Sequence, residues 1–300
     1  MKHRLYYRRR ILLAILAHAG GRVEKIRLQK LLFLFTRQQE KPAYHFLPYK
    51  FGCYSFQAAN DARILAARYD MLADDKNHYS LNRKNVDEKD IELNDADSKR
   101  LADLFRRYGN LNRNSLIYQV YEQYPRYAIN SELLDKPRFR PLSDRIKKEK
   151  IRKNDNRPTL YTIGYEGASV EEYITRLMEN AVSVLVDVRH NPFSMKYGFS
   201  RAPMQHITGE CGIRYIHIPE LGIVGSRRKH LKSRADFDRL FALYRQSLPE
   251  QEESLQCIQD MLHKYTRIAL TCFEKDHAWC HRHAIAEAIR ARCEITVEHL

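Results

Sequence analysis

Long apolar runs, cysteines and internal repeats are all scarce or missing in this 300-residue chain. No run approaches the roughly 18 apolar residues of a membrane-spanning helix, so we expect no segment that crosses a bilayer. The six cysteines are sparse and irregularly spaced, which excludes a small disulfide scaffold and favours a cytoplasmic location. We find no internal repeat and no low-complexity tract, so neither a repeat architecture nor a disordered chain is expected.

Acidic residues are also in short supply: 37 Asp and Glu stand against 52 Lys and Arg, for a formal net charge of +15. This excess favours a polyanionic partner, most commonly nucleic acid. An anionic membrane surface and a simple contribution to solubility are the alternatives. With 44% hydrophobic and 30% charged residues, the chain can bury real cores and is long enough for two domains. No pattern specifies the oligomeric state.

Residues 1–135 are expected to form a basic, mainly helical module. The apolar spacing predicts helices over residues 8–18, 23–39 and 58–69, followed by a hairpin over residues 72–81. Three arginines before the first apolar run imitate a secretory signal, but the second helical stripe so soon afterwards favours a helix pair. Three helices closed by a small β-ribbon form the winged-helix plan, a variant of helix-turn-helix.

Two stretches of this module carry a family resemblance. The run from Arg27 to Phe35, followed by Pro48-Tyr49-Lys50-Phe51-Gly52, resembles the Panacea-like helix-turn-helix domains. Those domains often stand beside toxins and in phage-defence settings. Because they recognise proteins as well as DNA, a protein-binding module is an alternative to a DNA-binding one. Cys53 departs from the pattern, which has proline after the glycine.

Residues 136–157 are predicted to be an exposed basic linker. Between Arg138 and Arg157, nine Lys or Arg stand against three Asp or Glu, and prolines occur at 137, 141 and 158. Such a segment either grips a phosphate backbone or is simply a solvated connection.

From residue 158 onward, strands and helices alternate. Strands are predicted over residues 160–163, 182–188, 215–218, 268–273 and 295–297, and helices over 170–180, 236–248, 254–265 and 282–291. This alternation predicts an α/β fold: residues 158–300 should form a Rossmann-like domain with a parallel sheet. Ser169 is the expected N-cap of the first helix.

Five separated motifs of this domain occur in the order of a known family. They are Thr162-Ile163-Gly164-Tyr165-Glu166-Gly167, Asp187-Val188-Arg189, Gly198-Phe199-Ser200, Pro219-Glu220-Leu221-Gly222, and Cys272-Phe273-Glu274 with Cys280-His281-Arg282. The region resembles the "domain of unknown function 488" family, which implies a Rossmann-like fold but no settled activity. After Asn191-Pro192 the family has Ser-Arg, whereas this chain has Phe193-Ser194-Met195-Lys196.

Polar side chains follow the ends of several predicted strands, where open α/β sheets bind their ligands. The predicted catalytic residues are Glu274, Glu166, Asp187, Cys272 and His281. The predicted phosphate- or substrate-binding residues are Tyr165, Gly167, Arg189, Arg201, Cys280 and Arg282. Glu166, Asp187, Glu220 and Glu274 are expected to face one crevice. There they would flank a sugar for glycosyl cleavage or hold Mg²⁺ for phosphodiester hydrolysis. Structural ion pairs, Asp187 with Arg189 or Glu274 with Arg282, are the alternative.

Metal and thiol chemistry compete with the carboxylates. Cys272, Cys280, His281 and His277 are candidate zinc ligands, although seven residues separate the cysteines instead of the usual two to four. A Cys–His nucleophile and plain packing of the thiols are the other interpretations. His206, His217, His230 and His299 show no partner spacing and are taken as ordinary residues. Because no third glycine follows Gly164 and Gly167, the dinucleotide fingerprint is missing and NAD is not expected.

These patterns lead to two hypotheses. In the first, a basic winged-helix-like module brings an α/β enzyme to nucleic acid, and the enzyme hydrolyses an N-glycosidic or phosphodiester bond. Glu274 is then the nucleophile or essential carboxylate. In the second, the chain is a non-enzymatic regulator or antitoxin-like protein that senses a nucleotide.

Overall fold

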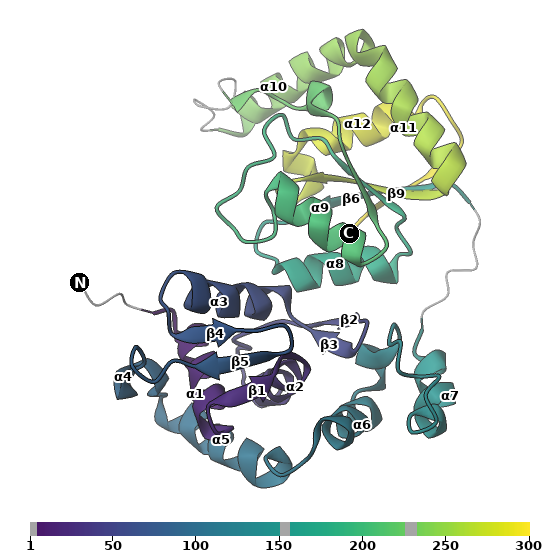
Figure 1. Cartoon of the computed structure of the whole chain (residues 1–300). Coiled ribbons are helices and arrows are strands. Elements are labelled where there is room, and N and C mark those ends of the chain that lie inside the picture. Colours follow the sequence, from purple (N-terminus) through teal and green to yellow (C-terminus); the bar gives the residue numbers. More distant parts are fainter. Residues whose placement is uncertain (1–4, 151–156, 226–232) are drawn as a thin grey trace. The chain divides into compact units, whose positions relative to one another are not determined.

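The computed structural model describes residues 5–150, 157–225 and 233–300. The chain divides into two compact units, Met1–Ile151 and Arg152–Leu300, each with its own contacts (Figure 1). No helix within the described residues is long and apolar enough to cross a membrane.

The first unit packs helices around small antiparallel sheets. Its helices are α1 (Tyr7–His18), α2 (Lys25–Thr36), α3 (Phe56–Ala67), α4 (Glu88–Ile91), α5 (Asp95–Tyr108), α6 (Arg113–Gln123) and α7 (Arg140–Lys148), with the 3₁₀ turn η1 (Pro125–Ala128). Its strands are β1 (Arg22–Glu24), β2 (Leu47–Tyr49), β3 (Gly52–Tyr54), β4 (Leu72–Asp74) and β5 (His78–Leu81). The sheet order is β1-β5-β4, and β2 and β3 form a separate pair. The three helices and the hairpin predicted from the apolar spacing are present, with slightly different ends.

A buried carboxylate joins α1 to α3 in this unit. Asp61 of α3 has no exposed surface and accepts hydrogen bonds from Nε of Arg8 at 2.6 Å and Nε of Arg9 at 2.7 Å. The hydroxyl of Tyr44 reaches the same carboxylate at 3.3 Å. Because the charge is met by two guanidinium groups, its burial is compensated.

The predicted linker 136–157 is not extended along its whole length. Residues 140–148 form helix α7, whose Leu142 and Ile146 are buried in the core of the first unit. Two apolar residues among many charges give only a weak helical pattern. The proline and charge content of the segment therefore suggested a linker. Residues 151–156 of the predicted linker lie outside the described part of the chain.

The second unit contains a five-stranded parallel sheet, which confirms the predicted α/β architecture. Its strands are β6 (Thr159–Gly164), β7 (Val184–Asp187), β8 (Arg214–His217), β9 (Arg267–Cys272) and β10 (Thr296–His299). The order across the sheet is β10-β6-β9-β7-β8, with every neighbouring pair parallel. Strands β6, β7 and β9 are buried along their full length, as expected for a sheet that helices cover on both faces.

Helices lie on both faces of this sheet. They are α8 (Val170–Glu179), α9 (Arg201–Glu210), α10 (Arg234–Ser247), α11 (Glu252–Tyr265) and α12 (His281–Arg290), with the 3₁₀ turns η2 (Pro219–Leu221), η4 (Leu248–Gln251) and η5 (His277–Trp279). Figure 1 shows α8 and α9 on one face and α10, α11 and α12 on the other. Ser169 caps α8 as predicted, in a reciprocal capping box with Glu172. Helix α9 was not predicted, because it buries only Met204, Ile207 and Thr208.

Strands β6 and β9 are neighbours in the sheet, and from their carboxyl ends the chain continues to opposite faces of the sheet. After β6 the chain enters α8 on one face, and after β9 it enters α12 on the other. Such a switch point opens a crevice at the carboxyl ends of the strands. The two loops also touch there: a Cβ on Gly164 would lie 1.7 Å from the carbonyl oxygen of Glu274. Only glycine therefore permits this approach.

Candidate functional site

A cavity of about 350 Å³ opens at the carboxyl edge of the parallel sheet. Its lining residues are Tyr165, Arg189, His190, Asn191, Phe193, Ile223, Gly225, Cys272, Phe273 and His281. Cys272 is the last residue of β9, and the others come from the segments that follow β6, β7, β8 and β9, together with the start of α12. The volume lies in the range of small-molecule sites. Of the residues predicted from the sequence, the cavity brings together Tyr165, Arg189, Cys272 and His281.

A thiol and an imidazole face each other in the cavity wall. The sulfur of Cys272 lies 3.7 Å from Nδ1 of His281, and both side chains are almost completely buried. The other ring nitrogen of His281, Nε2, is 2.9 Å from the carbonyl oxygen of Val188. Because a carbonyl only accepts, Nε2 carries the proton and Nδ1 is left as the acceptor that faces the sulfur. This is the geometry of a nucleophile beside an oriented base.

Cys280 adds a second thiol to this pair. Its sulfur lies 3.8 Å from the same Nδ1 of His281. The sulfur atoms of Cys272 and Cys280 and the ring nitrogen of His281 are all within 4.8 Å of one another. Burial, followed by the neighbouring Cys272, raises the pKa of the Cys280 thiol well above its usual range. Two thiols and an imidazole at this spacing form a set that could hold zinc.

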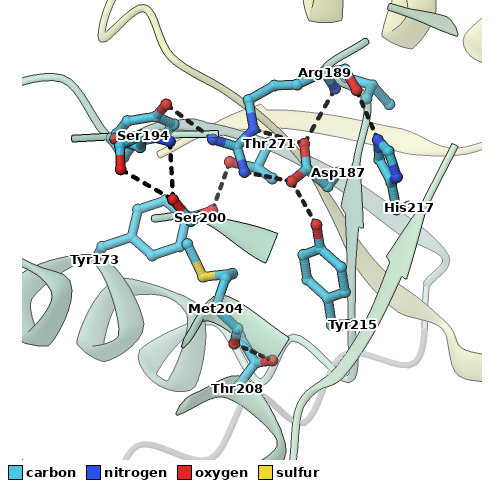
Figure 2. Close-up of polar contacts among 12 residues, drawn as sticks. Tyr173, Asp187, Arg189, Ser194, Ser200, Met204, Thr208, Tyr215, His217 and Thr271 are labelled. Carbon is cyan, nitrogen blue, oxygen red and sulfur yellow. Dashed lines mark hydrogen bonds and ion pairs between the residues drawn. The ribbon is translucent and has the colours of Figure 1, made fainter. Parts of the chain in front are cut away.

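Asp187, the last residue of β7, is the centre of a buried network (Figure 2). It has no exposed surface, and Arg189 donates to it from Nε at 2.8 Å and from Nη2 at 2.5 Å. Tyr215 of β8 donates its hydroxyl to the same carboxylate at 2.7 Å. Burial, and next the charge of Asp187, raise the pKa of Tyr215 and keep it protonated. Asp187 thus forms the ion pair with Arg189 that the sequence analysis named as an alternative.

The other half of this network positions Arg189 in the cavity wall. Its Nη1 donates to the hydroxyl of Tyr165 at 2.9 Å, and its main-chain carbonyl lies 2.8 Å from Nε2 of His217. The sequence did not single out Tyr215 or His217. Both lie on β8, and only the register that places β8 beside β7 brings them to Asp187 and Arg189.

The four carboxylates predicted to face one crevice do not line this cavity, as far as the described residues show. Asp187 is enclosed in its ion pair. Glu166 is exposed and accepts the backbone N–H of Lys275 at 3.1 Å. Glu220 is exposed in η2. The carboxylate of Glu274 lies beside a residue of the cavity wall, because it accepts a hydrogen bond from the Cys272 thiol at 3.2 Å. The physical reason is that each loop turns after the strand end, so proximity in sequence to a strand end does not fix where a side chain points.

The predicted cations also have different surroundings. Arg282 is 1% exposed and donates to the carbonyl oxygens of Glu274 at 2.6 Å and Lys275 at 3.0 Å, so it holds the loop after β9. Arg201 is exposed at the start of α9 and does not line the cavity.

Two other residues named from the sequence have no described place in the cavity lining. Gly167 is exposed in the turn before α8, with φ of +77°. His230 lies outside the described residues.

Aromatic side chains form a part of the cavity that the sequence did not reveal. Phe193 and Phe273 are 66% and 47% exposed. The ring of Phe273 meets that of Tyr165 edge-on, with centroids 5.3 Å apart, and Tyr165 stacks on Phe199 at 4.4 Å. The signal was present in the sequence: Phe193 stands where the resembling family has a polar pair. Exposed aromatic rings at a cavity are suited to stacking against a flat, unsaturated ligand.

Comparison with known proteins gives a family match for this unit. Residues 169–289 match the model of the family described as "Domain of unknown function DUF488", which agrees with the resemblance seen in the motifs. The matched segment contains the Cys272, Cys280 and His281 set and the Asp187–Arg189 pair. No curated protein matches the chain.

Proposed function

We propose that the second unit is a hydrolase that cleaves an N-glycosidic or phosphodiester bond in a nucleotide or nucleic acid, with Cys272 and His281 as its reaction centre. The observation that carries this proposal is the 3.7 Å approach of the Cys272 sulfur to Nδ1 of His281 in the cavity wall. A cysteine that only fills space in the core does not require an acceptor nitrogen beside its sulfur. A histidine that only packs in the core does not require a position in a cavity wall.

The chemistry that follows from this pair has two steps. His281 takes the proton of the Cys272 thiol at Nδ1, and the thiolate attacks the sugar carbon or the phosphorus of the substrate. The bond to the leaving group breaks, and His281 returns the proton to that group. A water molecule, deprotonated at the same Nδ1, then releases the covalent intermediate and restores the thiol. Glu274 accepts a hydrogen bond from the resting thiol, and the S–H turns from Glu274 to Nδ1 of His281 before the proton is transferred.

The cavity wall supports a nucleotide as the substrate class. Phe193 and Phe273 offer exposed rings on which a base would stack. Arg189 and His190 line the same cavity and would contact phosphate or ribose oxygens. The charge of Arg189 is largely balanced by Asp187, so binding would rely on stacking as much as on charge.

The first unit would bring this centre to nucleic acid. Its order of three helices, with β1 after the first and the β4–β5 hairpin after the third, supports a winged-helix arrangement. Helix α7 adds a charged surface, on which Arg140, Arg145, Lys147 and Lys148 are exposed while Leu142 and Ile146 pack inward. Cationic side chains on one helix face are suited to a phosphate backbone.

The test is a product survey with the purified chain. Single- and double-stranded DNA, RNA and free nucleotides would be incubated and analysed for released bases and for cleaved strands. Free base identifies glycosidic cleavage, whereas shortened strands or nucleoside monophosphates identify phosphodiester cleavage. Cys272→Ala and His281→Gln should both lose the activity. Cys257→Ala is the matched control, because Cys257 is exposed on α11. Equal activity in Cys272→Ala and the wild type would refute the proposed centre.

A zinc-dependent hydrolase is the second candidate, favoured by the convergence of Cys272, Cys280 and His281. The residues fit the metal, because Nδ1 of His281 is the acceptor and its Nε2 is held by the Val188 carbonyl, the usual outer-sphere partner of a zinc-bound histidine. Bound zinc would supply an activated water. Cys280→Ser separates the candidates: it should remove both metal and activity from a zinc enzyme, but leave a thiol nucleophile active.

A non-enzymatic nucleotide sensor is supported by a different observation. The exposed rings of Phe193 and Phe273 and the side chain of Arg189 line a cavity that no free carboxylate enters among the described residues. Saturable nucleotide binding in isothermal calorimetry, together with unchanged substrate in every product assay, would establish the sensor and exclude the hydrolase.

A further inference from the structure

A second cluster of metal-binding side chains lies outside the cavity wall. One ring nitrogen from each of His277, His283 and His299 lies within 4.8 Å of the others. The rings of His277 and His283 are stacked with centroids 5.0 Å apart, and His277 and His299 approach to 3.6 Å. None of these residues lines the 350 Å³ cavity.

Three different elements bring these imidazoles together. His277 belongs to η5, His283 to α12, and His299 to β10, which pairs with β6. On α12, residues 281 and 283 are two positions apart and therefore point to nearly opposite sides of the helix. His281 faces the thiols, while His283 faces the other two histidines.

Two of the rings have partners that fix their orientation. Nε2 of His283 lies 3.3 Å from the carboxylate of Glu287, one turn further along α12, so this nitrogen carries a proton and Nδ1 is an acceptor. Nδ1 of His299 lies 2.7 Å from the hydroxyl of Thr162 on β6. Carboxylates and hydroxyls in this position are the usual outer-sphere partners of metal-bound histidine.

Two ring nitrogens of the cluster have no hydrogen-bond partner. Nδ1 of His277 and Nδ1 of His283 are shielded from solvent and make no hydrogen bond within the described part of the chain, and the carboxylate of Asp276 lies 4.0 Å from Nδ1 of His277. Leaving a shielded polar atom without a hydrogen-bond partner destabilises the folded chain. A ligand that bonds to these atoms would remove this destabilisation. For an acceptor nitrogen such as Nδ1 of His283, that ligand can be a cation.

We propose that His277, His283 and His299 form a binding site for a divalent transition-metal ion, with Zn²⁺ as the ion that best suits three imidazoles. Imidazole is a favoured ligand of zinc, copper and nickel, whereas magnesium and calcium prefer oxygen. Around a tetrahedral ion with Zn–N bonds of about 2.0–2.1 Å the nitrogens must close to about 3.3 Å. His277 and His283 are only half-buried, so their rings can turn to make this approach.

The electrostatics agree with this geometry. Burial, and next the neighbouring His277 and His283, lower the pKa of His299 to about 4. Burial also lowers the pKa of His277. A metal-binding imidazole must be neutral, and the lowered pKa values of His277 and His299 favour their neutral form.

This site changes two of the sequence-based interpretations. His299 was taken as an ordinary residue, and His277 was grouped with Cys272 and Cys280. The structure instead groups both with His283, because β10 lies beside β6 only in the folded sheet. The proposal is independent of the hydrolase: the thiol pair and the three histidines are separate sets of residues.

The test uses Co²⁺ as the probe, because its spectrum distinguishes the two clusters. Thiolate ligands give a sulfur-to-cobalt charge-transfer band, whereas imidazole ligands give only ligand-field bands. The full chain, stripped of metal by a chelator, would be titrated as wild type and as Cys272→Ser/Cys280→Ser. We expect the double variant to bind one Co²⁺ per chain without charge transfer. Failure of this variant to bind Co²⁺ while it melts like the wild type would overturn the proposal.

Histidine variants complete the test. His283→Ala and His299→Ala should lose this binding, and Glu287→Gln should weaken it by about 10–100-fold. His206→Ala is the matched control, an exposed histidine on α9, and should bind as the wild type does. Added Zn²⁺ should raise the melting temperature of the thiol-free double variant, but not that of the same variant carrying His283→Ala. Equal cobalt affinity with and without His283 would refute the site.

Discussion

Each unit of this protein contains a carboxylate that has no exposed surface and is paired with arginine, but these two ion pairs have different surroundings. Asp61 lies between α1 and α3 and binds Arg8 and Arg9, with Tyr44 as a further donor. Asp187 lies at the end of β7 and binds Arg189, with Tyr215 as the further donor. Both carboxylates have no exposed surface. Arg189 of the second pair lines the 350 Å³ cavity.

The difference shows how a structural ion pair can serve a site without taking part in chemistry. The pair at Asp61 joins α1 to α3. The pair at Asp187 fixes Arg189 against Tyr165 at 2.9 Å. Under the proposed function, the first pair would contribute to stability alone, and the second also to the shape of the cavity.

The largest effect is expected from Cys272→Ala, which should separate the tasks of the two units. Without its nucleophile the hydrolase should lose on the order of 10³-fold or more in turnover. Affinity for nucleic acid, which we assign to the first unit, should stay unchanged. Rate measurements and filter binding on the same preparation check both parts. A parallel loss of affinity would show that the units do not divide the work in this way.

Asp187→Asn and Asp61→Asn should each lower the free energy of unfolding by about 3–5 kcal/mol, because each leaves buried guanidinium charge without its partner. Denaturant melts followed by fluorescence would measure the change. The comparison is sharpened by ligand affinity: Asp187→Asn should also weaken nucleotide binding to the cavity, whereas Asp61→Asn should not. Identical affinities in the two variants would show that the Asp187 pair does not shape the site.

Glu274→Gln should lower turnover by about 10²-fold while the melting temperature stays close to that of the wild type. The amide keeps the shape but removes the charge that accepts the Cys272 thiol at 3.2 Å, and a misplaced reacting group costs about 10²-fold. Steady-state kinetics beside a thermal melt measure both quantities. A strongly lowered melting temperature with proportionate loss of turnover would make Glu274 a structural residue.

The smallest effect is expected from helix α7. Replacing Arg140, Lys147 and Lys148 by alanine should weaken nucleic-acid binding by about 10-fold and flatten its salt dependence, because each lost phosphate contact removes about 0.9 from the log–log slope. Arg239, Lys264 and Arg290 are exposed cations of the second unit, and their triple alanine variant is the control. Equal slopes in both triple variants would remove α7 from the binding surface.

Local patterns in the sequence were sufficient for most of the fold. The alternating strands and helices after residue 158 predicted the parallel sheet, because buried parallel strands contain near-continuous apolar runs, such as residues 184–186 of β7. Ser169 was recognisable as a cap from its position before an apolar stripe. Helices α7 and α9 were missed because each buries only two or three side chains, too few to give a clear period.

The candidate site was predicted only in part. The motif around Cys272, Cys280 and His281 was visible, since a strand that ends in cysteine and a helix that begins with histidine meet at one edge of any parallel sheet. The sequence offered the Asp187–Arg189 ion pair only as an alternative, and it could not show that Tyr215 would bind the same carboxylate. That outcome depends on the register between β7 and β8.

The sequence by itself determined which residues form strands and helices and which edge of the sheet gathers reactive groups, because hydrophobic periodicity and chain direction are local properties. Tertiary structure alone decided the partners. It enclosed Asp187, placed Cys272 against His281, and joined His299 to His277 and His283 through the pairing of β10 with β6. Partners are set by distances between side chains far apart in the chain, and these distances exist only after the strands have taken their order and register.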